Sequence, residues 1–208
     1  MEKRAETQAP VHDLLARRWS PRAFSDQSVE PVKLLSLFEA ARWAPSSNNE
    51  QPWAFIVAAK DDQKNFEAMV SVLVEFNRGW ANRAAVLILT LAHTQFEKDG
   101  TPNRHGFYDL GQAAISIALQ ATAMGLMAHQ MAGFSVEVAR ERFSVPQGWE
   151  PVSVIAIGYP GDLDTLSDRL RQREIAPRQR KPVEQFVFSG TWGHPAPIVA
   201  SAEKAGAS

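Results

Sequence analysis

Four stretches of the chain carry the hydrophobic pattern of buried β-strands. Three are nearly continuous apolar runs, Trp53–Ala59, Ala84–Leu91 and Val152–Tyr159, and a shorter one covers Leu126–Met131. Apolar and β-branched runs of this length between turn residues indicate strands that are buried on both faces. Such strands need helices on each side, because both faces of the sheet must be kept from water. The pattern therefore predicts helices packed around a central sheet.

Helical periodicity fills the segments between these strands. Pro31–Trp43 has proline in its first turn, repeats apolar residues every three or four positions, and must end before Pro45. Gln63–Asn77 shows the same spacing. Phe107–Met124 is an alanine-rich segment of eighteen residues, followed by Gly125 as a stop signal. Because this last segment is apolar on nearly all sides, we expect it at the centre of a domain or of an assembly.

The order of these elements predicts one α+β domain over residues 1–208. The order is helix, helix, strand, helix, strand, long helix, strand, helix, strand. The sequence has no internal repeat, and no segment rich in Gly, Ser or Pro divides it. Residues 189–208 are poor in apolar side chains, so we expect an irregular tail that either docks on another surface or is mobile.

The composition excludes several classes of function. With 208 residues, 45% of them hydrophobic, the chain can bury a core without covalent staples. The absence of cysteine excludes disulfides, thiolate nucleophiles and Cys-ligated metals. A net charge of −1 gives no field that would attract nucleic acid or an anionic membrane. No apolar run approaches the roughly 20 residues of a spanning helix, and the polar N-terminus lacks a secretory core, so we expect a cytoplasmic protein.

Most catalytic motifs are missing. The sequence contains no phosphate-binding loop, dinucleotide fingerprint, zinc-protease helix or nucleophile elbow. His93, His105 and His129 lack the spacing that places two imidazoles on one metal, so we interpret them as structural or surface histidines. The acidic residues form no obvious pair. We therefore expect no metal site and assign no side chain as a general acid or base.

Two arginine clusters are candidates for anion binding, because guanidinium groups offer a planar fork of donors. The first combines arginines with a hydroxyl group, and its residues are Arg18, Trp19, Ser20 and Arg22. The second contains Arg178 and Arg180. Each cluster could instead be a solvated basic surface, and for the second cluster alone this is the simpler interpretation.

Two loops are candidates for binding a planar, polyhydroxylated ligand. A run of hydroxyl and amide side chains lies between two prolines, and its candidate residues are Pro45, Ser46, Ser47, Asn48 and Gln51. The alternative is a capping turn between a helix and a strand. A second loop follows the predicted strand at Met131, where Ala132 and Gly133 leave backbone amides open to a flat ligand. By itself, this loop is also an ordinary turn.

Together these features match the needs of flavin mononucleotide (FMN): arginines for its phosphate, hydroxyl and amide groups for its ribityl chain, and backbone donors for its ring. The sequence resembles the nitroreductase-like, FMN-dependent NAD(P)H oxidoreductases from about Asp13 to Phe188. Five motifs occur in the family's order: RRWSPRAF, APSSNNEQPWAF, YDLGQAAISIALQATAMGL, AGF and RQRKP. The resemblance implies an α+β fold with a central, mostly antiparallel sheet flanked by helices, and an intertwined homodimer with two FMN sites.

The resemblance also assigns roles to residues. It places Arg18 and Ser20 near the FMN phosphate and Arg22 near the ribityl chain or ring, and it implies that Arg178 and Arg180 complete the phosphate site. Asn77 corresponds to the amide that recognises the pyrimidine edge of the ring. Ala132 and Gly133 correspond to the backbone donors for the reactive nitrogen and the adjacent carbonyl. Pro45, Ser46, Ser47 and Asn48 would line the cofactor from the opposite subunit, and Gln51 belongs to the same motif.

Three positions depart from the family pattern. Trp19 replaces a polar or basic residue, and Ala132 stands where some members have an acidic one. Trp80 occupies a position that often carries a cation, with Arg83 as a substitute. The resemblance implies hydride transfer from NADH or NADPH to a nitroaromatic, quinone or similar small molecule in a ping-pong cycle. Two alternatives remain: a flavin-binding protein without turnover, and a specialised flavin dehydrogenase or dehalogenase on the same fold.

Overall fold

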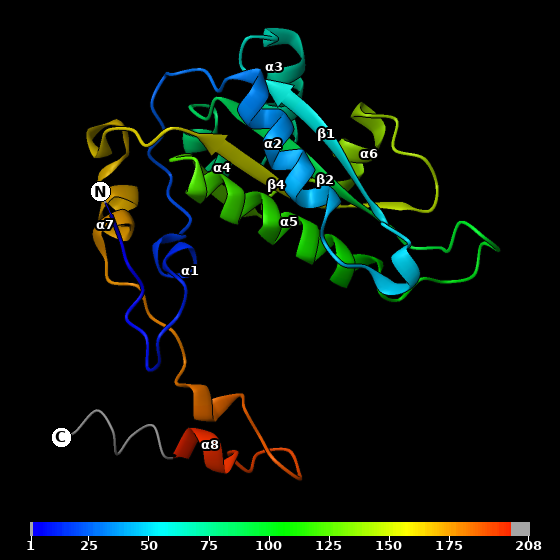
Figure 1. Cartoon of the computed structure of the whole chain (residues 1–208). Coiled ribbons are helices and arrows are strands. Elements are labelled where there is room, and N and C mark those ends of the chain that lie inside the picture. The colour runs from blue at the N-terminus through cyan, green and yellow to red at the C-terminus, as the bar shows by residue number, and fades with distance from the viewer. Residues whose placement is uncertain (1, 201–208) are drawn as a thin grey trace. The chain divides into compact units, whose positions relative to one another are not determined.

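The computed structural model describes residues 2–200, which divide into two compact units. The larger unit comprises residues 18–175 and contains the sheet (Figure 1). The smaller unit combines residues 2–17 with residues 176–200. The expectation of a single domain stays a prediction, and residues 201–208 of the expected tail lie outside the described residues.

Four antiparallel strands form the sheet, in the order β1-β2-β4-β3. Their bounds are β1 Trp53–Ala59, β2 Val86–His93, β3 Met127–Met131 and β4 Trp149–Gly158. The strand β2 is central and buried over nearly its whole length. Its leucines at 87 and 89 enter one core, while Val86 and Ile88 enter the other. This alternation confirms the expectation of burial on both faces for β2, and β4 is buried from Val154 to Gly158. The edge strand β1 differs from the expectation, because it is mostly half-buried and Val57 is exposed.

Helices cover the two faces of the sheet. On one face lie α2 (Pro31–Arg42) and α5 (Gly106–Ala123), in front of the sheet in Figure 1. On the other face lie α3 (Gln63–Val72), α4 (Glu75–Ala81) and α6 (Val136–Arg142). The helix α7 (Asp168–Ile175) follows β4 and the short turn η2 (Leu163–Thr165). The sequence-based α+β fold is thereby confirmed.

The segment Gln63–Asn77, expected to be one helix, is two helices with a break at Leu73 and Val74. Both residues have extended backbones, with ψ of 147° and 153° respectively. Leu73 pairs with Phe134 in an isolated bridge, and the Val74 N–H donates to the Gly133 carbonyl at 3.0 Å. These tertiary hydrogen bonds outweigh the local helical periodicity. They join residues that are distant in sequence, so a periodic pattern cannot predict them.

The smaller unit contains three short helical segments: α1 (Asp13–Arg17), η3 (Val183–Gln185) and α8 (Pro197–Ala200). The Ala5 N–H donates to the Ala16 carbonyl at 2.9 Å, and the Val183 N–H donates to Gln8 at 3.1 Å. The C-terminal segment folds back on itself through a bridge between Phe188 and Pro195. Across residues 2–200, no helix is long and apolar enough to span a bilayer.

Candidate functional site

The arginine turn, defined as residues 18–23, leads into an anchor at the end of β4. Phe24 forms an isolated bridge with Pro160, just after β4 ends. The Gly161 N–H donates to the Ala23 carbonyl at 2.9 Å. A Cβ atom at Gly161 would stand 2.2 Å from a Phe24 backbone atom, so only glycine fits this approach. The end of the sheet thus fixes the direction in which the arginine turn leaves it.

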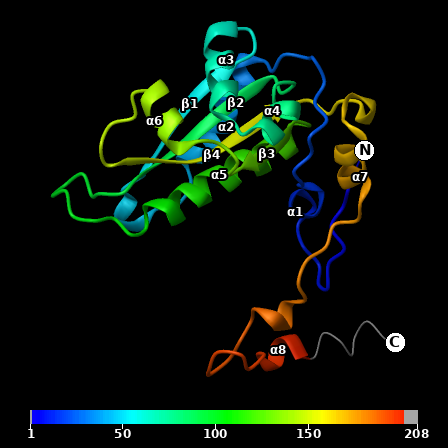
Figure 2. The same cartoon turned by 180° about the vertical axis from the view of Figure 1, so that it is seen from behind.

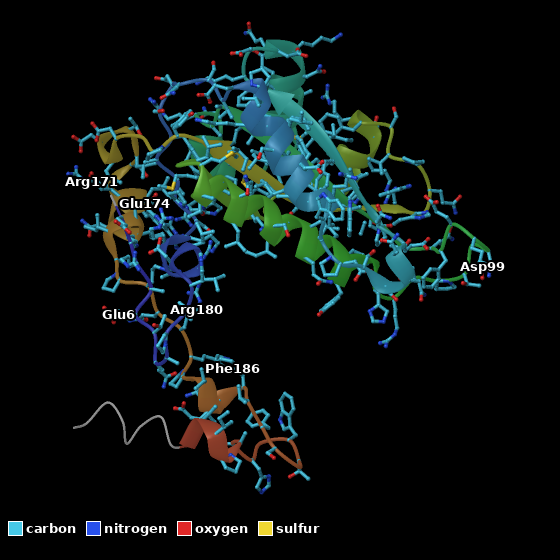
Figure 3. The ribbon with its side chains drawn as sticks, viewed as in Figure 1. Glu6, Asp99, Arg171, Glu174, Arg180 and Phe186 are labelled. Carbon is cyan, nitrogen blue, oxygen red and sulfur yellow. The ribbon has the colours of Figure 1, made fainter. Side chains whose placement is uncertain are left out.

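A buried carboxylate holds the turn from α7. Glu174, shown on α7 in Figure 3, is only 1% exposed. Its Oε1 accepts the backbone N–H of Arg22 at 2.5 Å and that of Ala23 at 3.4 Å. Its Oε2 accepts from Arg22 Nη1 at 3.4 Å. Sequence analysis missed Glu174, although Leu170, one helical turn earlier, gave α7 a buried face on which Glu174 also lies.

A histidine on β3 also binds the arginine turn. The Nδ1 of His129 lies 2.9 Å from the Pro21 carbonyl, and because a carbonyl only accepts, Nδ1 carries the proton. Burial first, and the positive charge of Arg22 second, lower the pKa of His129 from 6.5 to about 4. His129 is therefore a neutral, hydrogen-bonded structural histidine, as the sequence analysis expected.

The buried side chain of Trp80 packs against the arginine turn and its neighbours. It is 1% exposed, and its ring centroid lies 6.3 Å from that of Phe24 and 4.6 Å from that of His129. The guanidinium carbon of Arg22 lies 5.8 Å from the Trp80 ring centroid, within the range of a cation–π interaction. Where the family resemblance implies a cation, this chain therefore has the aromatic ring of Trp80, and Arg22 places a cation beside that ring.

Two predicted site residues that are far apart in sequence meet beside the edge strand β3. The side-chain amide of Asn77, on α4, donates to the Gly133 carbonyl at 3.0 Å. A Cβ atom at Gly133 would stand 2.4 Å from Asn77 Nδ2, so the approach requires glycine. Asn77 thus fixes the turn that follows β3, and its second amide hydrogen and its oxygen remain for a ligand. Figure 2 shows β3 and α4 on this side of the sheet.

The polar loop between Pro45 and Pro52 is strained and firmly held. Asn48, Asn49 and Gln51 have φ values of 55°, 57° and 53°, in the left-handed region that disfavours side chains. The Ser47 N–H donates to Asp109 Oδ2 at 3.0 Å, and Asp109 on α5 is 1% exposed. A strained backbone of this kind persists only where many surrounding contacts hold it in place, and such residues are frequent at functional sites. Asp109 is a second buried carboxylate that sequence analysis missed.

The polar loop and the arginine turn lie at opposite ends of the sheet. The loop leads into Trp53, at the end of the sheet where β4 begins with Trp149. The arginine turn leads into Phe24, which pairs just beyond the far end of β4. Ten strand residues span about 30 Å, at about 3.3 Å per residue. One copy of the chain therefore does not bring both motifs to one ligand (Figure 1).

The remaining predicted residues fall into three groups. Met131 is buried in the core, which leaves only its backbone for a ligand, while Ala132 is exposed. Arg18 is half-buried and donates from Nη1 to Ser20 Oγ at 3.3 Å; Trp19 is half-buried as well. Arg178 and Arg180 belong to the smaller unit, so their predicted role beside Arg18 stays a prediction.

Within the smaller unit, Arg178 is used structurally. Its Nη1 donates to the carbonyls of Lys3 and Ala16 at 2.8 and 2.9 Å. Partial burial, followed by the charge of Arg180, lowers the pKa of Arg178. Nη1 of Arg178 therefore ties the two chain ends together, whereas Arg180 is exposed and donates to the Gln179 carbonyl.

The chain is similar to known proteins in sequence and in fold. The model of the nitroreductase family matches residues 15–159. A 15.4 kDa protein of Mycolicibacterium smegmatis is 34% identical over 147 residues, which are 68% of this chain and 98% of that protein. A crystal structure of an oxidoreductase containing FMN has a TM-score of 0.86 and 34% identity, covering 91% of this chain and 96% of the other.

A second solved structure, an FMN-dependent nitroreductase from Clostridium difficile R20291, is 28% identical, with a TM-score of 0.59 over 72% of this chain and 87% of the other. The fold and these relatives define an oxidoreductase. The chain belongs to the nitroreductase family, since the family model covers more than half of it. Across residues 2–200, no three His, Asp or Glu side chains gather closely enough to hold a metal ion.

Proposed function

We propose that the chain is an FMN-dependent oxidoreductase that takes hydride from NADH or NADPH and reduces nitroaromatic, quinone or similar acceptors in a ping-pong cycle. The observation that carries this proposal is the convergence on β3. The arginine turn is bonded to His129 within this strand, and Asn77 is bonded to Gly133 just after it. Because donors for a phosphate and for a flavin ring share one strand edge, one elongated ligand can contact both.

The residues present suit FMN in their chemistry. FMN offers phosphate oxygens, ribityl hydroxyls and ring carbonyls, and the residues along β3 offer mainly donors. Nε of Arg22 and Nε1 of Trp80 are buried without an acceptor among residues 2–200. The carboxylate of Glu174, which lies against the turn, accepts three hydrogen bonds from it and is buried rather than facing the solvent. An acceptor-rich anion is therefore the ligand that this edge suits.

In this proposal, Arg18 and Ser20 bind the phosphate together with Arg178 and Arg180, and Arg22 lies near the ribityl chain or ring. Bound FMN supplies the hydride chemistry, and the protein supplies orientation and charge. Backbone donors at Ala132 and Gly133, together with arginine charge, would stabilise negative charge on the ring. Protons come from water, so the proposal needs no side-chain acid.

A homodimer completes the proposed site. The residues Pro45, Ser46, Ser47, Asn48 and Gln51 would reach the FMN bound by the opposite subunit. The distance of about 30 Å between this loop and the arginine turn along β4 supports that arrangement. The exposed apolar side chains of α5 also support it: Phe107, Tyr108 and Ile115 are 51%, 69% and 39% exposed. A cytoplasmic location stays a prediction.

The deciding experiment is the absorbance spectrum of the pure protein before and after each nicotinamide. We expect a yellow protein whose flavin band bleaches without oxygen on addition of NADH or NADPH and returns with a quinone or nitroaromatic. A colourless protein that binds no added FMN would overturn the proposal. A yellow protein that neither nicotinamide reduces would identify a flavin-binding protein without turnover.

The phosphate role has its own test. Arg18→Ala combined with Arg180→Ala should weaken FMN binding by at least tenfold, because each charge-assisted hydrogen bond contributes about 1.5–3 kcal/mol. The matched control is Arg142→Ala, an exposed arginine on α6, which should leave FMN affinity unchanged. Equal affinities of the double variant and the control would refute the phosphate role of Arg18 and Arg180.

A further inference from the structure

Glu174 is an unusual residue for the helix that carries it. The helix α7 is rich in arginine, and its three arginines, at 169, 171 and 173, are exposed. Glu174 alone among the charged residues of α7 is buried, at 1% exposure. Burying a carboxylate is costly unless donors surround it, so this position needs a compensating role.

The position of α7 is fixed from a second direction. The guanidinium carbons of Arg169 and Arg173 lie 5.9 and 5.5 Å from the ring centroid of Phe76 on α4. Phe76 directly precedes Asn77. The same helix therefore packs against the element that carries the candidate ring-recognising amide and reaches the arginine turn through Glu174. This geometry links the two halves of the candidate site.

The hydrogen bonds of Glu174 define what it does. Three donors to Glu174 come from the arginine turn: the backbone N–H groups of Arg22 and Ala23, and Nη1 of Arg22. Two of them fix the backbone of the turn, and the third fixes the guanidinium. The carboxylate accepts all three of these bonds, and its ion pair with Arg22 opposes the charge of that guanidinium.

Glu174 supplies the negative charge that opposes the charge of Arg22. The Arg22 side chain is 21% exposed and lies over the Trp80 ring. His129, which faces the same turn, is neutral because burial lowers its pKa to about 4. Arg18 is a further cation whose charge reaches His129. Among residues 2–200, Glu174 is the only carboxylate for which the structure gives an ion pair with Arg22.

We propose that Glu174 is a positioning residue of the flavin site, which aims Arg22 at the ligand and sets the net charge that Arg22 presents to it. The inference rests on the proposed function, because it needs FMN beside Arg22. Two-electron reduction of the flavin adds negative charge to its ring, so a cation nearby stabilises the reduced form more than the oxidised form. Glu174 offsets that cation and holds the flavin potential down.

The test measures the FMN midpoint potential and FMN affinity in the holoprotein. Glu174→Gln keeps the shape and removes the charge, so it should stabilise reduced over oxidised FMN by about tenfold, which raises a two-electron potential by about 30 mV. Tenfold is the lower end of the effect of one charge on a partly buried neighbour. Glu141→Gln, at an exposed position on α6, is the matched control and should leave the potential unchanged.

Two further variants separate charge from structure. Arg22→Gln leaves Glu174 unneutralised and should lower the potential, and the double variant should return it toward the wild-type value. Glu174→Asp keeps the charge but shortens the reach, so it should weaken FMN binding with little change in potential. A structural role alone does not predict opposite signs. Potentials that are unchanged, or that move in the same direction in Glu174→Gln and Arg22→Gln, would overturn the inference.

The two failures can be told apart. If the wild-type protein binds no FMN, the proposed function fails and this inference fails with it. If the wild type binds FMN and the potentials of the variants equal that of the control, only the role of Glu174 fails. If Glu174→Gln does not fold, the potential of Arg22→Gln decides: a lower value supports the proposal, and an unchanged value overturns it.

Discussion

His129 should make the protein measurably less stable in mild acid. Burial beside Arg22 lowers the pKa of His129 from 6.5 to about 4, while in the unfolded chain the pKa keeps its ordinary value. Between these two values the unfolded state binds one more proton than the folded state, so stability rises with pH across this window. Above pH 6.5 the imidazole is neutral in both states and adds no pH dependence.

The magnitude follows from the pKa difference. One pKa unit corresponds to 1.36 kcal/mol, so a fall from 6.5 to about 4 costs about 3 kcal/mol once the pH drops below 4. His129 is 8% exposed, so little of this effect is lost to solvent screening. About 3 kcal/mol is a large share of the 5–15 kcal/mol that stabilises a typical domain.

A comparison with His129→Asn isolates this effect. Asparagine keeps a side-chain donor for the Pro21 carbonyl but does not titrate. Any stability that the substitution itself removes is the same at every pH, so it does not affect the pH dependence. Urea unfolding of both proteins at pH 7.5, 6, 5 and 4, followed by tryptophan fluorescence at fixed protein and FMN concentrations, gives the two free energies of unfolding. The stability advantage of the wild type over the variant should shrink by about 3 kcal/mol from pH 7.5 to pH 4.

Two results would refute this reasoning. One is an advantage of the wild type that stays constant over the whole pH range. The other is an NMR titration in which the His129 imidazole of the folded protein takes up its proton near pH 6.5. Either result would show that the ring is solvated or that the charge of Arg22 does not act on it as the structure indicates.

Two further predictions concern the polar loop and the turn after β3. Asp109→Asn should lower the free energy of unfolding by about 1–3 kcal/mol, because a buried acceptor of the Ser47 N–H loses its charge; a change below about 0.5 kcal/mol in urea unfolding would show that other contacts hold the loop. Gly133→Ala should cost about 1–3 kcal/mol and weaken FMN binding, because its Cβ would stand 2.4 Å from Asn77 Nδ2. Gly79→Ala, at an exposed position of α4 with nothing within 4 Å, should instead add about 0.5–1 kcal/mol, and equal effects at the two glycines would contradict the packing argument.

Local patterns were sufficient for the strands and for most helices. The apolar run Trp53–Ala59 is the strand β1 to the residue, and the alanine-rich segment Phe107–Met124 is α5 shifted by one residue. Both signals depend on neighbouring residues alone: a run between turn residues for the strand, and a 3.6-residue period for the helix. The same reasoning failed at Leu73, because a bridge to Phe134, distant in sequence, breaks the helix there.

The candidate site shows the same division. The motifs around Arg22 and Gly133 could be chosen from the sequence because their residue types suit a flavin, whereas Asn77 was chosen through the family resemblance. Their meeting could not be derived from spacing alone, since the contact of Asn77 with Gly133 joins two elements 56 residues apart. The buried carboxylates of Glu174 and Asp109 were missed because packing between distant segments buries them, and no local pattern records that packing.

By itself, the sequence therefore determined the strands, the long helix and the residue types that suit a flavin, because hydrophobic period and donor chemistry are local properties of the chain. Only the tertiary structure decided which end of the sheet each motif occupies and which charges are buried. Those outcomes depend on strand register and on packing between distant segments. The register places the polar loop about 30 Å from the arginine turn, and packing turns Glu174 from one acidic residue among many into the partner of Arg22.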